Sequence, residues 1–318
     1  MQLYEEVLQV LLIGIANGSI VALIALGYTL VYGIIELINF AHGDLFMMGT
    51  MVALTIATWI PSVVGVRNIL QLPALGIVGA VIAMLATSML VCGLLNVLIE
   101  RVAYRRLRNA PRLAPLISAI GVSFILINVG LLWKSARQLN FPDVMPRVDI
   151  LHGVLGLNTT ILFTLKDVIV IALAIPLMVG LQLFVQRTRL GKAMRATAQD
   201  RDAASMMGID INLTIALTFL LGGLLAGAAG TIYGMYNNSA YFLQGFRNGL
   251  YAFTAAVMGG IGNLQGAFLG GILIGMIAAI SDRLWDPRWT EAVVFAILVV
   301  ILIFKPTGLL GEATTERA

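Results

Sequence analysis

A group of ionisable and amide side chains lies between two long apolar stretches near the start of the chain. The group consists of Glu36, Asn39, His42 and Asp44, with Gly43 between the last two. Charged groups at membrane depth are costly and usually face a cavity or a partner. The group therefore has two possible structural roles. In the first it is an element of a solute pathway or gate. In the second it is a turn in which Asp44 caps the next helix and His42 is exposed.

Catalysis by His42 and Asp44 would need a nucleophile or a metal, and no third group stands near them in sequence. The chain has two histidines and one cysteine, which is too few for a His/Cys metal site within one chain. The other histidine, His152, falls in a loop that is expected outside the membrane, and Cys92 lies in an apolar run without a disulfide partner. We expect no catalytic residue, no metal and no cofactor, with an intramembrane enzyme as a minor alternative.

A second candidate group follows an apolar stretch near residue 260. The sequence GGIGNLQG there contains Gly260, Gly262, Asn263 and Gln265. Its glycines do not have the spacing of a dinucleotide-binding turn. The group predicts an irregular turn that lines a permeation path and offers hydrogen bonds. Glycines four residues apart, which are frequent in this half of the chain, equally predict close helix packing in lipid.

The segment 187–210 is charged and helix-prone, in contrast to the rest of the chain. Its alanines and methionines are more apolar than a solvated connector requires, and methionine is suited to filling a groove on a partner. The residues expected to contact a partner, some as a polar rim, are Arg195, Ala196, Asp200, Asp202, Ala203, Ala204, Met207 and Gly208. The sequence contains no G-x-x-x-x-G-K-[ST] phosphate loop, so ATP hydrolysis would take place on another chain.

The composition defines the class of protein that positions these groups. Of the 318 residues, 59% are hydrophobic and 11% are charged, and the mean hydropathy is +0.96. These values predict an all-α, polytopic membrane protein with one transmembrane domain over residues 1–318. Apolar runs of membrane length occur near 7–33, 45–60, 73–99, 113–133, 167–186, 213–236 and 290–304.

The stretch 249–281 is longer than one span needs, and glycines interrupt it. It predicts a half-helix, a turn and a return helix. We therefore expect eight or nine crossings, with broken or re-entrant segments near 34–44 and 255–266.

Basic residues predict the orientation. Two short loops, around 101–112 and 187–201, hold half of the 20 Lys and Arg residues, and the positive-inside rule places both in the cytoplasm. The connection 134–166, with Pro142, Pro146, Asn158 and Thr159, is then a periplasmic loop with little helix. The N-terminus, which lacks the features of a signal peptide, is expected outside and the C-terminus inside. The net charge of +4 is not a nucleic-acid signature, because the bases are not interleaved with aromatics.

The chain resembles the permeases of branched-chain amino acid ABC importers, and the shorter LivH-like subunit more than the longer LivM-like one. The resemblance runs almost from end to end and rests on the segments 26–33, 38–44, 100–105, 116–121, 252–262 and 306–308 and on the acidic-Ala-Ala pattern that runs from Asp202 to Gly208. Two departures are Arg106, where the family often has proline, and Asp202, where the family has glutamate.

The resemblance implies a subunit of a heteromeric importer in the bacterial inner membrane. Its partners would be a second, LivM-like permease, two LivG/LivF-like ATPases, a periplasmic substrate-binding protein and membrane lipid, with no nucleic acid. The segment 187–210 would be the cytoplasmic coupling loop, with one moving helix over 196–208. The cargo would be branched-chain or other neutral amino acids, or alternatively amides or urea.

The translocation path would be lined by a set of polar and glycine residues, which are Asn17, Ser19, Tyr28, Glu36, Asn39, His42, Asp44, Asn128, Gly260, Gly262, Asn263 and Gln265. A passive channel of the urea or water type, without ATP coupling, is the main alternative mechanism.

Overall fold

The computed structural model describes residues 3–36, 39–108, 110–111, 113–146, 148–153 and 161–311. Asn158 and Thr159 of the expected periplasmic loop lie outside these described residues, as do Arg112 of the first basic loop and Ile38 of the segment 38–44.

Long apolar helices make up most of the fold. They are α1 (Leu3–Ile35), α2 (Ala41–Val64), α3 (Ala74–Ile99), α4 (Leu113–Lys134), α6 (Leu165–Arg187), α9 (Ile211–Asn237), α11 (Leu264–Leu284) and α12 (Thr290–Phe304). The helical turns η2 (Glu100–Tyr104) and η3 (Arg105–Leu107) extend α3, and η4 (Pro287–Trp289) precedes α12. Within the described ranges, eight stretches are long and apolar enough to cross a membrane. The protein is thus an all-α, multi-pass membrane protein, as predicted.

The shorter elements connect these helices. They are η1 (Ile69–Gln71), β1 (Leu139–Asn140), α5 (Ile150–Gly153), α7 (Arg189–Gln199), α8 (Arg201–Met206), β2 (Ser239–Ala240) and α10 (Gln244–Gly259). Strands β1 and β2 pair antiparallel, with Leu139 opposite Ala240. This pairing joins the connection after α4 to the end of α9.

The stretch 249–281 forms the helical hairpin that the sequence predicts. Helix α10 has 16 residues, so it is about 24 Å long and too short to cross a hydrocarbon core of about 30 Å. The turn after it contains Gly260 and Gly262, whose φ angles of 106° and 94° are rarely accessible to other residues. Helix α11 then returns toward the end of the bundle from which α10 came.

Helix α2 begins inside the bundle rather than at its surface. The ring of His42, in its first turn, occupies the space that a side chain on Gly27 would need. Helix α1 continues beyond Gly27 to Ile35, which is about 12 Å further along its axis. The chain therefore turns back after α1 and re-enters the bundle before α2 starts, so the interruption predicted near 34–44 is present.

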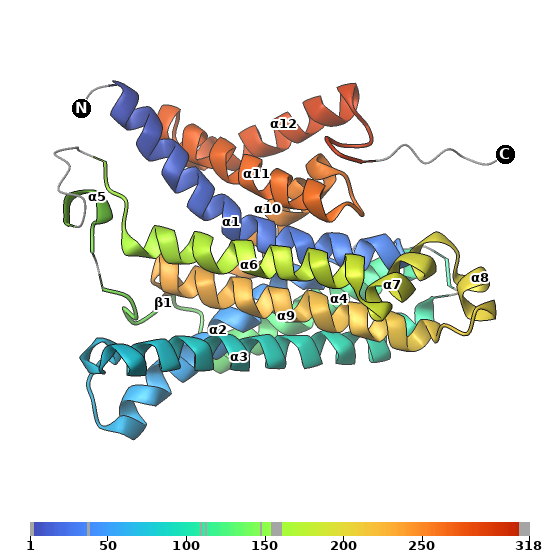
Figure 1. Cartoon of the computed structure of the whole chain (residues 1–318), viewed down its shortest axis with the longest axis horizontal. Helices are drawn as coiled ribbons and strands as arrows, with labels where there is room; N and C mark the ends of the chain where they lie inside the picture. The colour runs from blue at the N-terminus through green and yellow to red at the C-terminus, as the bar shows by residue number, and fades with distance from the viewer. Residues whose placement is uncertain are drawn as a thin grey trace.

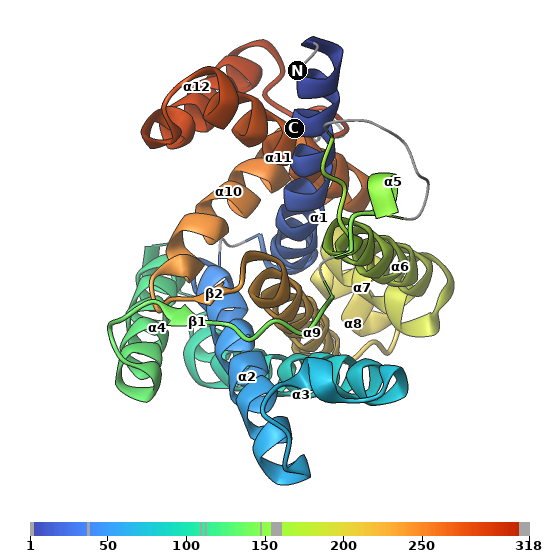
Figure 2. The same ribbon diagram turned by 90° about the vertical axis from the view of Figure 1, so that its left-hand side faces the viewer.

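Helices α1 and α9 form the centre of the bundle, and the other helices surround them (Figure 2). About 67% of the most apolar stretch of α1 and 72% of that of α9 are buried inside the bundle. The corresponding share is 17% for α4 and for α12. Glycines allow this packing, because Gly227 of α9 lies against the backbone of Ser88 on α3, and Gly230 lies against Phe46 on α2. Polar groups within the bundle add hydrogen bonds, such as the one from Asn96 Nδ2 to the carbonyl of Phe219 at 2.6 Å.

The two ends of the bundle differ in character (Figure 1). Helices α7 and α8 lie at one end, which we call the α8 end, and α5, β1 and the start of α1 lie at the other, which we call the α5 end. The last described residues return to the α8 end of α10, where Leu309 and Leu310 donate backbone hydrogen bonds to Met258 and Gly259 at 2.8 and 2.9 Å.

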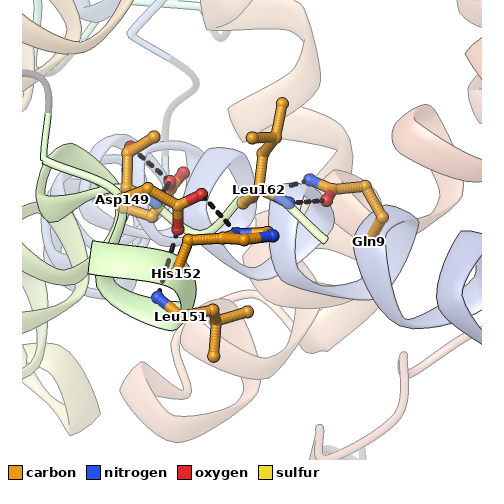
Figure 3. A network of polar contacts seen from close by, with 7 residues as sticks. Gln9, Asp149, Leu151, His152 and Leu162 are labelled. Atoms are coloured by element: carbon orange, nitrogen blue, oxygen red, sulfur yellow. Dashed lines mark hydrogen bonds and ion pairs between the residues drawn. The ribbon is translucent and has the colours of Figure 1, made fainter. Parts of the chain in front are cut away.

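At the α5 end, side chains fix the connection between α4 and α6 (Figure 3). Gln9 of α1 pairs with the backbone of Leu162 in both directions, at 2.9 and 2.6 Å. Asp149 accepts hydrogen bonds from Leu151 N at 3.1 Å and from His152 Nδ1 at 2.9 Å. Desolvation raises the pKa of Asp149, but the hydrogen bonds from His152 and Leu151 together outweigh it, so the pKa lies below its ordinary value. His152 is therefore held locally and is far from the group around His42.

We predict that Gly275→Val destabilises the fold. A Cβ at Gly275 of α11 would overlap the backbone of Gly18 on α1, and overpacking of this kind costs about 1–3 kcal/mol. The expected result is a lower thermal unfolding temperature of the purified protein in detergent. Gly79→Val is the matched control, because Gly79 is also helical and nothing lies within 4 Å of its Cβ position. Equal unfolding temperatures for the two variants would contradict the close α1–α11 contact.

Candidate functional site

Four helices bring a group of polar side chains together where α2 begins. This polar cluster consists of Tyr28, Asn39, His42, Asp44, Tyr104 and Ser123. Tyr104 Oη donates a hydrogen bond to Asn39 Oδ1 at 2.8 Å, and Ser123 Oγ donates one to Asp44 Oδ2 at 2.5 Å. The rings of Tyr28 and His42 meet edge to face, with centroids 4.8 Å apart.

The polar cluster is shielded from solvent. His42 is 0% exposed, Asp44 is 1% exposed and Asn39 is 2% exposed. The alternative in which His42 is exposed and Asp44 caps α2 is therefore wrong. The N-cap position of α2 is Phe40, which makes no side-chain hydrogen bond to the helix, and Asp44 lies within the first turn. The physical reason is that α2 starts inside the bundle.

Glycines let the starts of α2 and α10 touch. A Cβ on Gly43 would lie 2.5 Å from the carbonyl oxygen of Gly245 and 2.9 Å from the Cα of Gly249. The hydroxyl of Tyr28 reaches the same place, 3.2 Å from the Cβ position of Gly249. Two helix N-termini, each carrying a partial positive charge, thus meet beside the carboxyl group of Asp44.

An apolar cavity of about 260 Å³ adjoins the polar cluster between α4 and α10. Its walls are mostly aromatic and aliphatic, and Tyr28 and Ser123 bring hydroxyl groups to it. The lining residues are Tyr28, Phe40, Ile120, Ser123, Phe124, Ile127, Gly245, Phe246, Gly249, Leu250 and Phe253. We call this space the α4–α10 cavity. An apolar cavity with a few convergent polar groups is the usual form of a small-molecule site.

A second, larger cavity of about 620 Å³ lies at the α8 end. Gly262, Asn263 and Gln265 line it together with Arg195 of α7. Asn263 also caps α11 by accepting a hydrogen bond from Gly266 N at 3.0 Å. Gly260 instead packs against Gly311. The turn predicted to line a path thus borders a cavity, but not the one beside Asp44.

The remaining path candidates are dispersed. Asn17 lines a separate cavity of about 170 Å³ that also contains Asp282 near the α5 end of α11. Ser19 is buried and bonds to the carbonyl of Ile15 at 2.7 Å within α1. Asn128 is exposed on α4 and bonds to the carbonyl of Phe124 at 2.8 Å. Glu36, with φ of 53°, borders a cavity at the α8 end.

The segment predicted to contact a partner is two helices rather than one. The expectation of a single helix over 196–208 is wrong, because Asp200 is extended (φ −158°, ψ 113°) and separates α7 from α8. Asp200 also caps α8 by accepting a hydrogen bond from Ala203 N at 2.9 Å. Gly208, with φ of 81°, ends the segment.

Helix α8 and its C-cap residue Met207 present apolar side chains to the outside. Met206 and Met207 are 85% and 83% exposed, whereas Ala204 is buried against the bundle. Asp202 and Ala203 are exposed beside the methionines. Exposed methionines at the end of a polar loop form an adaptable contact surface.

Two arginines attach this segment to the bundle. Arg201 donates a hydrogen bond to the carbonyl oxygen of Ile34, in the last turn of α1, at 2.9 Å. Arg195 donates one to the carbonyl of Val185 on α6. A cation at a helix C-terminus is favourable because the last carbonyls of the helix have no intrahelical partner. Arg195 therefore anchors α7 to α6, and the role expected for it at the rim of a partner contact stays a prediction.

Several residues of this site could not be predicted from the sequence. Ser123 and Tyr104 bond to Asp44 and Asn39, and Phe246 and Phe253 line the α4–α10 cavity. No signal in the sequence separated them from the other residues of apolar helices. Their role depends on which helices are neighbours.

A multi-pass bundle with a half-helix, a buried polar cluster and an apolar cavity has the parts that a membrane transport protein needs. A family model described as branched-chain amino acid transport system / permease component matches residues 10–302. The chain belongs to this family.

Individual relatives agree with the family. The high-affinity branched-chain amino acid transport system permease protein BraD of Pseudomonas aeruginosa is 39% identical over 310 residues, with 98% of this chain and 97% of the relative covered. The permease protein LivH of the corresponding Escherichia coli system is 37% identical over the same length and coverage. A probable branched-chain amino acid permease LivH of Methanocaldococcus jannaschii is 28% identical over 93% of this chain and 90% of the relative.

We predict that Gly27→Ala and His42→Ala are strongly coupled. The methyl group in Gly27→Ala would collide with the buried ring of His42, and His42→Ala would remove that collision. The double variant should be more stable than the sum of the single effects implies, by about 1–3 kcal/mol. Thermal unfolding of the four proteins in detergent measures this coupling. Additive effects would contradict the contact, and Gly180→Ala, at an exposed position with nothing within 4 Å, is the control.

Proposed function

We propose that this chain is the transmembrane permease subunit of an ABC importer for branched-chain or other neutral amino acids. In this proposal the chain forms part of the translocation path and hydrolyses no ATP itself. The observation that carries the proposal is the exposed apolar surface of α8, with Met206 and Met207 more than four-fifths exposed at the end of a polar loop. A loop that touched only water would gain nothing from these side chains.

The proposed partners supply the functions that this chain is not expected to perform itself, such as ATP hydrolysis and delivery of the cargo. A separate pair of ATPases of the LivG/LivF type would bind α8, a LivM-like permease would complete the path, and a periplasmic binding protein would deliver the cargo. The names of BraD and LivH, which refer to a high-affinity branched-chain amino acid transport system, support this assembly.

We propose the bacterial inner membrane as the location, with the α8 end in the cytoplasm. Most of the basic residues of the loops fall at that end, including Arg105 and Arg108 after α3 and Arg187 and Lys192 around α7. The positive-inside rule then favours a cytoplasmic α8 end. The start of α1, which pairs with Leu162 at the α5 end, would be periplasmic, and Lys305 after α12 cytoplasmic.

The contact between α8 and α1 suggests how movement is transmitted. Closure of the ATPases would displace α8, and Arg201 would pass this displacement to Ile34 at the end of α1. Helix α1 also carries Tyr28 of the polar cluster and lines both the α4–α10 cavity and the larger cavity at the α8 end. In the proposed cycle, a shift of α1 would open one cavity as the other closes, as alternating access requires.

The walls of the α4–α10 cavity favour an amino acid with an apolar side chain. Phenylalanine and isoleucine side chains form most of its surface, and hydroxyl groups reach it only from Tyr28 and Ser123 among the described residues. Urea or a small amide would require more hydrogen-bonding groups around it.

We predict that Ala203→Arg uncouples transport from ATP hydrolysis. Ala203 is exposed on α8, and a long cationic side chain there would keep the ATPase from seating. Leucine uptake by proteoliposomes containing the assembled complex should fall about tenfold or more, since one badly placed interface charge costs several kcal/mol. Ala203→Ser is the control and should transport normally. Undiminished uptake by Ala203→Arg would refute the docking role, and uptake that survives ATP depletion would favour a passive channel.

We predict that Arg201→Gln lowers the number of leucine molecules transported per ATP hydrolysed. The variant weakens the link to the carbonyl of Ile34 while the apolar surface of α8 remains available to the ATPase. ATP hydrolysis should therefore continue as uptake declines. Arg189→Gln is the control, because Arg189 is exposed at the start of α7. A proportional fall of uptake and ATP hydrolysis would show that Arg201 acts in assembly and not in transmission.

A further inference from the structure

The carboxyl group of Asp44 is buried inside the bundle. Its side chain is 1% exposed, and its Oδ2 atom accepts a hydrogen bond from Ser123. Its other oxygen, Oδ1, is buried without a hydrogen-bond partner among the described residues. Because an unsatisfied carboxyl oxygen inside a membrane protein is costly, its retention calls for a ligand that completes it.

Both oxygens of Asp44 lie directly behind the wall of the α4–α10 cavity. Ser123, which holds Oδ2, lines the cavity. Gly245, which also lines the cavity, has its Cβ position 2.8 Å from Oδ1. A side chain at position 245 would collide with Oδ1, so glycine there is what lets the wall of the cavity come this close to the oxygen.

We infer that Asp44 binds the α-ammonium group of an amino acid whose side chain occupies the α4–α10 cavity. An ammonium group offers three hydrogen-bond donors and a positive charge, which match the unsatisfied Oδ1 atom. The α-carboxylate would then lie near the start of α10, where the helix dipole favours a negative group. The inference rests on the proposed function, and it assigns the recognition of the cargo's charged end to this chain.

The apolar part of the cavity complements this recognition. Phe253 and Phe40 stand together, with ring centroids 6.2 Å apart, and Ile120 and Ile127 of α4 complete the pocket. A volume of about 260 Å³ suits one small amino acid and lies just below the range of pockets for larger ligands. Charge at one end and an apolar wall at the other match a neutral amino acid with an aliphatic side chain.

A cysteine reporter in the cavity tests the inference without the binding protein or ATP. Ile127→Cys places a thiol in the cavity wall and leaves Asp44 and Ser123 unchanged. The native Cys92 is 0% exposed, so the protein without the Ile127→Cys change is the background control. The complex in detergent is treated with a cationic or an anionic methanethiosulfonate of similar size, and the rates are divided by those on a free thiol.

The cationic reagent should react about tenfold faster than the anionic one, because a buried negative charge raises the local concentration of cations. Asp44→Asn in the reporter protein should bring this ratio near one. Millimolar leucine should slow the reaction in the reporter, whereas 4-methylpentanoate, which has the same carbon chain and carboxylate but no ammonium group, should not. Asp44→Asn should abolish the protection by leucine.

Equal rates with both reagents, or equal protection by leucine and 4-methylpentanoate, would overturn the inference. If Asp44→Asn fails to fold, the comparison of the two ligands on the reporter protein still decides the question, and Ile120→Cys provides a second reporter. Protection by leucine together with an absence of ATP-driven uptake would leave the ammonium site standing and overturn the importer. ATP-driven uptake without any preference for the ammonium group would overturn the ammonium site and leave the importer standing.

Discussion

The close approach of two helix starts inside the bundle is the constraint on which the rest of this structure depends. Irregular backbone at membrane depth persists only where protein or a cavity covers it. Here the first turns of α2 and α10 cover each other, and glycine at 43, 245 and 249 is what allows their backbones to touch. The contact places two positive helix ends beside the carboxyl group of Asp44 and leaves the α4–α10 cavity next to them. A continuous pair of membrane-spanning helices would leave no such opening.

The same constraint gives α1 its central role. Helix α1 packs against α11 through glycines along much of its length, carries Tyr28 beside His42 and ends at the carbonyl that Arg201 holds. It is therefore in contact with the packed core, with the polar cluster and with the segment that we propose as the docking surface. Because tightly packed helices move as rigid bodies rather than deforming gradually, a displacement at one end of α1 is felt at the other.

The sequence predicted the architecture well, because hydropathy and glycine act through residues that are close together in the chain. Apolar runs of membrane length became membrane-length helices, and the glycine-interrupted stretch 249–281 became a half-helix and a return helix. The polar group at 36–44 is unusual between two apolar stretches, but the sequence leaves open whether His42 is exposed. The structure decided that it is buried. The sequence also predicted one helix over 196–208, where Asp200 in fact separates two, because a capping aspartate within a polar segment resembles an ordinary surface residue of a longer helix.

The sequence by itself therefore determined the class of the protein, its number of long spans within the eight-or-nine estimate, and the segments that break the helical pattern. All of these depend on hydropathy and on glycine, which act over neighbouring residues. Only the tertiary structure decided which polar groups meet. Asp44 and Ser123 are 79 residues apart in the chain, and so are held together by the packing of α2 against α4. Asn17 and Asn128, which looked equally suitable, point elsewhere. The sequence shows that a polar residue lies within an apolar helix, where it is costly, but the neighbouring helices determine which group it contacts.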